Sequence, residues 1–219
     1  MAAPLPNAKG PATAGIDSLS SLAPSSLAPV TLIIGGARSG KSAHGEALIE
    51  DCRAGEGAKP LYIATATPGD GEMAARIRKH KRRRGDRWET LEEPLEIARA
   101  LEANARPDRA ILLDCLTLWL SNLMGKGRDM AVETARLVGA LDNLEGPVVL
   151  IANEVGLGIV PDNALAREFR DQAGLLNQAV ARRAERVVFM AAGLPMTVKD
   201  AAPRGVVMGL RAIGGGGKP

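Results

Sequence analysis

The most constraining feature of this chain is a glycine-rich segment between an apolar run and a helix-forming stretch. The run at 30–34 is Val-Thr-Leu-Ile-Ile, and the segment at 35–42 is Gly-Gly-Ala-Arg-Ser-Gly-Lys-Ser. Glycines let the backbone curl so that successive N–H groups point at phosphate oxygens, and the N-terminus of the next helix favours an anion. At this spacing Lys41 reaches the β- and γ-phosphates, and Ser42 offers a hydroxyl to Mg²⁺. The pattern predicts a P-loop, NTPase-like α/β fold that binds a nucleoside triphosphate.

Strand and helix patterns alternate along the rest of the chain. Apolar or β-rich runs predict strands at 30–34, 60–65, 110–114, 147–152 and 186–191. Helical patterns occupy 43–51, 72–84, 94–104, 116–124, 130–144 and 163–186. This alternation favours an open, mostly parallel sheet flanked by helices, in a single domain.

Length and composition agree with one domain and two tails. Of the 219 residues, 46% are hydrophobic but only 2% aromatic, which predicts a core of Ala, Val, Leu and Ile. The segment 1–29 is rich in Ala, Pro, Ser and Gly and lacks the features of a signal peptide, so we expect a disordered extension. The folded domain is expected at 30–200, and 201–219, with its run of four glycines, is expected to be a flexible tail.

Charge and cysteine content limit the possible partners and setting. A net charge of +3 is too small on its own to indicate nucleic acid. Cys52 and Cys115 show no metal-ligand spacing, which favours a reduced, cytoplasmic setting. No apolar run is long enough to predict a membrane span.

Asp114 ends the apolar run at 110–114, some seventy residues after the glycine-rich segment. In P-loop folds a carboxylate at such a strand end holds Mg²⁺ opposite the loop hydroxyl, here Ser42. Aspartate is also a favoured N-cap, so capping of the following helix is the alternative role.

The segment 72–84 carries a dense run of basic residues around His80. Helical spacing places Arg76, Arg83 and Arg84 on one face with His80, and neighbouring cations favour a neutral, nucleophilic imidazole. The alternatives are a solvated basic helix with an incidental histidine, and a nucleic-acid patch. Residue spacing alone does not decide between them.

A second glycine-containing segment, at 153–161, follows the predicted strand at 147–152. We expect it to be a loop at the same edge of the sheet as the phosphate loop, where α/β proteins bind ligands. An ordinary strand-to-helix connection would have a similar composition.

Together these motifs resemble the bifunctional adenosylcobinamide kinase / adenosylcobinamide-phosphate guanylyltransferase family of cobalamin biosynthesis. The resemblance runs from about Val30 to Lys199. It is carried by the phosphate loop at 35–42, Tyr-Ile-Ala-Thr at 62–65, Glu-Met-Ala-Ala-Arg-Ile at 72–77, His80 with Trp88, Asn-Glu-Val-Gly-Leu-Gly-Ile-Val-Pro at 153–161, and Leu-Ala-Arg-Glu-Phe-Arg-Asp at 165–171 followed by Gly174 and Asn177-Gln178.

The resemblance implies two reactions: phosphorylation of adenosylcobinamide by ATP or GTP, then transfer of GMP from GTP through a guanylylated histidine, which matches His80. It implies Mg²⁺ at Ser42 and Asp114, no nucleic-acid partner, and a homo-oligomer, with a homotrimer as the expected form. The residues that it assigns to the nucleotide are Gly35, Gly36, Ala37, Arg38, Ser39, Gly40, Lys41, Ser42, Ala64, Thr65, Ala66, Lys81, Arg82, Arg83, Arg84, Glu92 and Asp114.

Two other functions remain compatible with the residues. A monofunctional P-loop small-molecule kinase would use the phosphate loop and leave His80 idle. A nucleotide-gated nucleic-acid-binding protein would use the basic run at 76–84, although the scarcity of aromatic residues disfavours base stacking.

Overall fold

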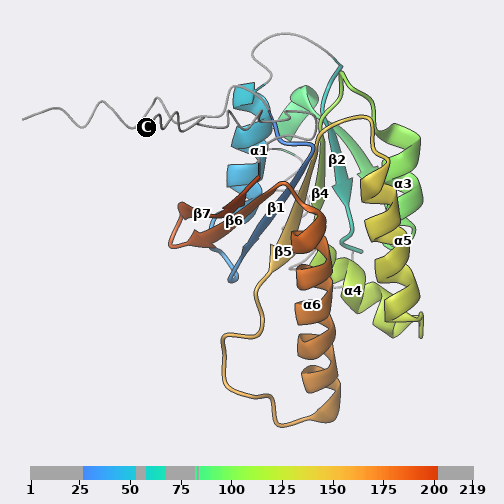
Figure 1. Cartoon of the computed structure of the whole chain (residues 1–219), viewed down its shortest axis with the longest axis vertical. Helices are drawn as coiled ribbons and strands as arrows, with labels where there is room; N and C mark the ends of the chain where they lie inside the picture. Colours follow the sequence, from blue (N-terminus) through green and yellow to red (C-terminus); the bar gives the residue numbers. More distant parts are fainter. Residues whose placement is uncertain (1–26, 53–57, 68–81, 83, 202–219) are drawn as a thin grey trace, which may run out of the picture.

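The computed structural model of the chain describes residues 27–52, 58–67, 82 and 84–201. In that part of the chain the elements follow the predicted alternation (Figure 1). They are β1 (Val30–Gly35), α1 (Lys41–Cys52), β2 (Leu61–Ala64), the 3-10 turn η2 (Gly85–Arg87), β3 (Glu89–Glu92), α3 (Ile97–Asn104), β4 (Ile111–Asp114), α4 (Leu116–Gly125), α5 (Met130–Asp142), β5 (Val148–Asn153), α6 (Ala164–Arg183), β6 (Arg186–Ala191) and β7 (Leu194–Asp200).

The described strands form one seven-stranded sheet with the order β3-β2-β4-β5-β1-β6-β7. All pairs are parallel except β6 and β7, which form an antiparallel hairpin at one edge. The hairpin turns at Ala192 and Gly193, which have φ of 51° and 83°, as a tight two-residue turn requires. The predicted mostly parallel sheet flanked by helices is confirmed.

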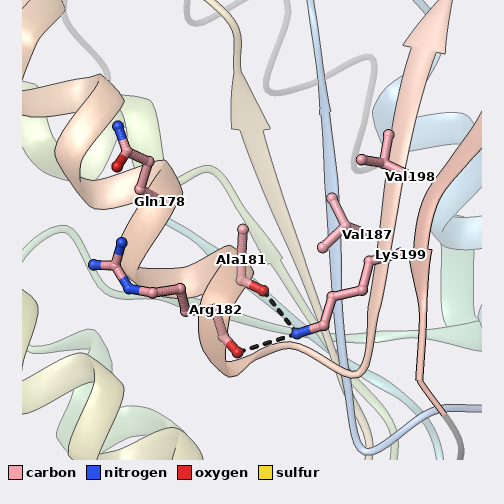
Figure 2. A pocket seen from close by; sticks show the side chains of 6 residues that line it. All are labelled: Gln178, Ala181, Arg182, Val187, Val198 and Lys199. Atoms are coloured by element: carbon pink, nitrogen blue, oxygen red, sulfur yellow. Dashed lines mark hydrogen bonds between the residues drawn. The ribbon is translucent and has the colours of Figure 1, made fainter.

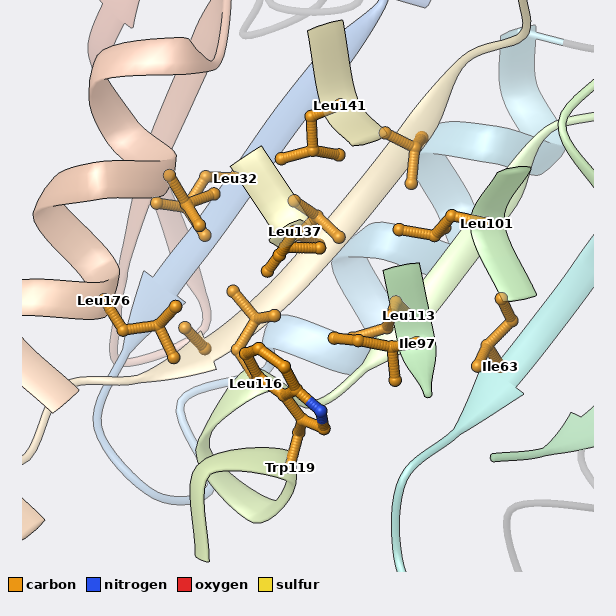
Figure 3. Packing of buried hydrophobic residues seen from close by; sticks show 14 of the residues in the cluster. Leu32, Ile63, Ile97, Leu101, Leu113, Leu116, Trp119, Leu137, Leu141 and Leu176 are labelled. Atoms are coloured by element: carbon orange, nitrogen blue, oxygen red, sulfur yellow. The ribbon is translucent and has the colours of Figure 1, made fainter. Parts of the chain in front are cut away.

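Helices cover both faces of the sheet because the central strands are apolar on both sides. In β1, Leu32 belongs to the core cluster that packs under α3, α4, α5 and α6, whereas its neighbour Ile33 packs on the opposite face with Ile49 of α1. Figure 3 shows the larger cluster, in which Leu116 and Trp119 of α4 meet Leu137 of α5. The site described below therefore stands on a core that is closed on both sides.

Helix α1 approaches the sheet closely at Gly45. A Cβ atom at this position would lie 2.9 Å from Leu112 Cδ1 and 3.1 Å from Ile151 Cδ1. The absence of a side chain lets α1 sit directly on β4 and β5, which fixes the helix that begins at Lys41.

Two strands were not predicted from the sequence, β3 and β7. The predicted helix at 72–84 lies outside the described residues except for Arg82 and Arg84, as do residues 1–26 and 202–219 of the predicted tails. Residues 27–29 lead into β1, and the carbonyl of Pro29 accepts a hydrogen bond from Val148 N at 2.9 Å.

Candidate functional site

Most of the predicted site residues that the structure describes lie at one edge of the sheet, where the parallel strands have their carboxyl ends. Strand register pairs Ala64 with both Asp114 and Glu92. On the other side of the sheet centre, Gly35 pairs with Asn153. This is the edge where open α/β sheets bind ligands.

The phosphate loop connects β1 to α1 with a strongly curled backbone. Arg38 and Gly40 have φ of 58° and 96°, in the left-handed region that such a curl needs. The Lys41 side chain folds back over the loop, and Nζ donates to Gly36 O at 2.5 Å and to Ser39 Oγ at 3.4 Å. The buried ammonium thus lies directly over the loop whose backbone is predicted to hold the phosphates.

The β6–β7 hairpin braces this loop from outside. Gly193 N donates to Ser39 O at 3.1 Å, and a Cβ atom on Gly40 would lie 3.4 Å from Gly193 Cα. A Cβ atom on Gly35 would lie 2.5 Å from the carbonyl oxygen of Met190. The curl is therefore held by its own glycines and by a neighbouring turn.

Asp114 and Ser42 meet at the centre of the site. Ser42 Oγ donates to Asp114 Oδ2 at 2.6 Å, and Tyr62 OH donates to the same oxygen at 2.7 Å. Cys115, not Asp114, caps α4, because its Sγ accepts from Leu118 N at 3.5 Å. The capping alternative for Asp114 is therefore wrong, and its carboxylate faces the phosphate loop.

The oxygen atoms of Ser42 and Asp114 fit Mg²⁺. This cation prefers hard oxygen ligands and usually binds through one or two carboxylates together with substrate phosphates. Among the described residues no group of three or more His, Cys, Asp or Glu side chains gathers to form a fuller metal cage. The site thus fits a metal brought together with a nucleotide.

Tyr62 connects this carboxylate to the basic segment. The guanidinium carbon of Arg84 lies 3.4 Å from the centroid of the Tyr62 ring, and Trp88 meets the ring edge-on with centroids 6.3 Å apart. Burial, reinforced by the neighbouring Asp114 carboxylate, raises the pKa of Tyr62 well above its usual value of 10. The hydroxyl therefore stays protonated and donates.

The structure separates the two described arginines of the basic segment. Arg82 is exposed, whereas Arg84 is only 3% exposed and its Nη1 lies 3.8 Å from Glu46 Oε1. His80, Lys81 and Arg83 lie outside the described residues.

The segment after β2 is tied to its neighbours by Thr65 and Asn122. Thr65 Oγ1 donates to Cys115 O and accepts from Cys115 N, both at 2.8 Å. Asn122 Nδ2 donates to Thr65 O at 2.8 Å and to Pro94 O at 3.0 Å. These bonds hold the ends of β2, β3 and β4 together, with Glu92 exposed at the rim.

The loop after β5 lies at the same edge, as predicted, but unlike the phosphate loop it exposes apolar side chains. Glu154 N donates to Gly35 O at 2.9 Å, which joins this loop to the start of the phosphate loop. Beyond it, Leu157, Ile159 and Val160 are 81%, 97% and 64% exposed. The loop presents apolar side chains to solvent next to the phosphate site.

His44 lies on α1 behind the phosphate loop and is half-buried. Burial lowers its pKa from the usual value, which favours the neutral imidazole. Among the described residues its side chain makes no hydrogen bond or ion pair with Asp114 or Lys41, so its place on α1 suits a helix-surface role better than a chemical one.

A separate pocket lies between α6 and the β6–β7 hairpin, away from the phosphate loop (Figure 2). Its lining residues are Gln178, Ala181, Arg182, Val187, Val198 and Lys199. Lys199 Nζ donates to the carbonyls of Ala181 and Arg182, both at 3.1 Å, and so caps the C-terminus of α6. The polar contacts of this pocket thus serve the helix end.

Within the described residues, no helix combines the length and the apolar character that crossing a membrane would require.

Sequence reasoning assigned no role to one residue of this site, Tyr62, which it named only within a predicted strand and within the motif at 62–65. A polar tip on an otherwise apolar strand, two residues before the strand end at Ala64, is the sequence feature that could have drawn attention to it.

The family model and the sequence relatives identify the same family. A family model described as cobinamide kinase / cobinamide phosphate guanyltransferase matches residues 31–198. The bifunctional adenosylcobalamin biosynthesis protein CobP of Pseudomonas aeruginosa is 49% identical over 170 residues, which cover 77% of this chain and 96% of that protein. The CobU protein of Escherichia coli, with the same description, is 40% identical over 183 residues, covering 77% and 98%. Among solved structures, the flagellar accessory protein FlaH of Methanocaldococcus jannaschii is 10% identical with a TM-score of 0.47, covering 80% of each chain.

Proposed function

Because the chain belongs to the cobinamide kinase / cobinamide phosphate guanyltransferase family, we propose that the phosphate loop and Asp114 hold the nucleotide while His80 carries GMP. As a member of this family the chain is an enzyme with both activities, cobinamide kinase and cobinamide-phosphate guanylyltransferase. The observation that carries the proposal is the hydrogen bond between Ser42 and Asp114, which joins the phosphate loop to a carboxylate at 2.6 Å.

In the kinase reaction, ATP or GTP gives its γ-phosphoryl group to the cobinamide hydroxyl. Lys41 would contact the β- and γ-phosphates, and backbone N–H groups of the loop would hold the phosphate oxygens. Mg²⁺ bound at Ser42 and Asp114 would offset the negative charge of the transferring group. The chain's own contribution is to hold the triphosphate in line with the acceptor.

In the second reaction, a nitrogen of neutral His80 attacks the α-phosphorus of GTP. A P–N bond forms, the bond between the α-phosphorus and the bridging oxygen breaks, and pyrophosphate leaves. An oxygen of cobinamide phosphate then attacks the same phosphorus, the P–N bond breaks, and the free histidine is restored. The remaining nucleotide contacts that we propose are Ala64, Thr65, Ala66, Lys81, Arg82, Arg83, Arg84 and Glu92.

The position of Arg84 supports a role for His80 at this site. Arg84 packs on Tyr62, whose hydroxyl contacts Asp114, and His80 precedes Arg84 by four residues in the sequence. Four residues of chain span at most about 14 Å. A histidine tethered so shortly to the edge of the site is a suitable GMP carrier.

The chain's two histidines allow a matched test. Incubation with α-labelled GTP and Mg²⁺ is expected to give acid-labile, base-stable label on wild type and on His44→Ala, and none on His80→Ala. Unlabelled wild type at saturating GTP, in a preparation that phosphorylates cobinamide, would contradict the histidine step and support the monofunctional kinase.

We further propose that the enzyme acts in the cytoplasm as a homo-oligomer, specifically a homotrimer, without a nucleic-acid partner. Two free cysteines among the described residues fit a reducing compartment. The exposed apolar side chains of the loop after β5 suit contact with another copy of the chain.

A further inference from the structure

We infer that Tyr62 is a positioning residue for both transfers, in which its hydroxyl orients the Asp114 carboxylate and its ring seats the Arg84 guanidinium. The inference rests on the proposed function, in which Asp114 serves the nucleotide-bound metal.

The hydroxyl contact is the first part of the argument. Asp114 Oδ2 accepts from Ser42 at 2.6 Å and from Tyr62 at 2.7 Å. In a P-loop the serine oxygen would be a metal ligand, and its hydroxyl proton can still be donated to Asp114. Tyr62 donates to the same carboxylate oxygen from a separate strand and would fix the carboxylate's orientation, the role that outer-shell hydrogen bonds have at metal sites.

The ring contact is the second part. Arg84 is 3% exposed, and its Nε and Nη1 atoms make no hydrogen bond with the described residues. Its guanidinium carbon lies 3.4 Å from the Tyr62 ring centroid, and among the described residues the carboxylate oxygen that pairs with Nη1, on Glu46, lies 3.8 Å away. The ring face and that carboxylate together offset the hydration that the cation loses on burial.

Through these contacts Tyr62 touches two residues of the proposed site, Asp114 and Arg84, which lie on separate segments of the chain. Arg84 ends the run Lys81-Arg82-Arg83-Arg84, and Asp114 ends β4. Trp88 holds the ring from its edge, and Trp88 Nε1 is itself fixed by Glu50 Oε1 at 2.9 Å. Tyr62 is thus a rigid link between the metal carboxylate and the basic segment.

Tyr62→Phe separates the two contacts because it keeps the ring and removes the hydroxyl. Its matched control is Thr31→Val, which removes a fully buried hydroxyl that makes no hydrogen bond within the described residues. Binding of Mn²⁺, a substitute for Mg²⁺, to GDP-loaded protein is measured from the electron paramagnetic resonance of free Mn²⁺. Tyr62→Phe is expected to weaken Mn²⁺ binding about tenfold, and Thr31→Val to leave it unchanged. In kinase assays kcat should fall while the KM for nucleotide stays within about twofold.

Arg84 tests the ring contact. Arg84→Met is expected to slow labelling by α-labelled GTP about tenfold or more, whereas Arg84→Lys, which keeps the charge, should retain part of the rate. The control is Arg99→Met, at an exposed position on α3.

Equal Mn²⁺ affinities of Tyr62→Phe and wild type would overturn the hydroxyl role, and unchanged labelling in both Arg84 variants would overturn the ring role. Wild type that binds Mn²⁺ with GDP but takes no label would contradict the His80 proposal instead. In that case the Mn²⁺ titration still decides the role of Tyr62.

Discussion

The loop after β1 and the loop after β5 leave the same edge of the sheet side by side but are stabilised in different ways. The loop at 36–40 is short, is braced by the β6–β7 turn, and has its lysine folded over it. The loop at 154–163 is joined to it by Glu154 and then exposes a series of apolar side chains. The first is held by its own glycines and by the neighbouring turn, whereas the second carries apolar side chains that no described part of the chain buries.

This difference shows how the two loops divide their tasks. Backbone curvature and a buried cation are local properties, and they suit a ligand whose charge and shape are invariant, such as a triphosphate. Exposed leucine and isoleucine side chains contribute favourable burial free energy only when another molecule covers them. Substitutions in the two loops should therefore affect different measurements.

The largest effect is expected from Lys41→Met in the first loop. Removing the ammonium that meets the β- and γ-phosphates should lower kcat of the kinase by about 10²–10³-fold, with the fold retained. Phosphorylation of cobinamide by labelled ATP measures the loss, and Lys126→Met, at an exposed position after α4, is the control. A Lys41→Met enzyme within threefold of wild type would remove the phosphate loop from the mechanism.

Substitutions in the second loop should weaken association between copies of the chain and leave the stability of the single chain unchanged. Leu157→Ser with Ile159→Ser removes two side chains that are 81% and 97% exposed. If another copy covers them, each contributes about 1.5–3 kcal/mol to association, while single-chain stability changes by less than about 0.5 kcal/mol. Sedimentation velocity and urea unfolding measure the two quantities separately.

Val132→Ser is the control for this pair, since Val132 is an exposed apolar residue on α5, outside the loop. An unchanged sedimentation coefficient in the double variant would show that copies of the chain do not meet through this loop.

A smaller difference is expected between the free energies of unfolding of Gly45→Ala and Gly158→Ala. The Cβ atom at Gly45 would lie 2.9 Å from Leu112 Cδ1, whereas one at Gly158 meets nothing within 4 Å. Overpacking under the first loop should outweigh alanine's better helix propensity and cost about 1–2 kcal/mol. Gly158→Ala should be neutral in the same urea titrations, and equal stabilities would argue against tight seating of α1.

The sequence predicted the elements whose residues are buried on both faces. Runs such as 110–114 and 147–152 are continuous and apolar because central parallel strands are covered on both sides. Strands β3 and β7 escaped prediction because they lie at the two edges of the sheet. Three of the four residues of β3 are polar, and β7 contains Pro195 and is largely exposed, so neither has a buried pattern to detect.

The same distinction holds for the site: the features set by local sequence could be predicted, and those that depend on strand order could not. The phosphate loop and the strand-end Asp114 follow from local patterns, and the structure brings Ser42 and Asp114 together. The contact of Tyr62 with Asp114 joins residues 52 positions apart, so it depends on strand order. Nor does local sequence reveal the burial of Arg84, because long charged side chains are rarely buried without a close partner.

The smallest expected effect lies where the second loop ends and local sequence again specifies structure. Asn163 caps α6, and its Oδ1 accepts from Ala166 N at 2.7 Å. Asn163→Ala should lower the free energy of unfolding by about 1 kcal/mol, and Asn163→Asp should preserve it because a carboxylate accepts the same bond. The neighbouring Asp162 is the control, since Arg167 contacts its backbone carbonyl at 2.8 Å and not its side chain, so Asp162→Ala should be neutral. Thermal unfolding should place Asn163→Ala about 2–4 °C below Asp162→Ala; coincident transitions would mean that the Asn163 side chain does not contribute to the stability of this helix start.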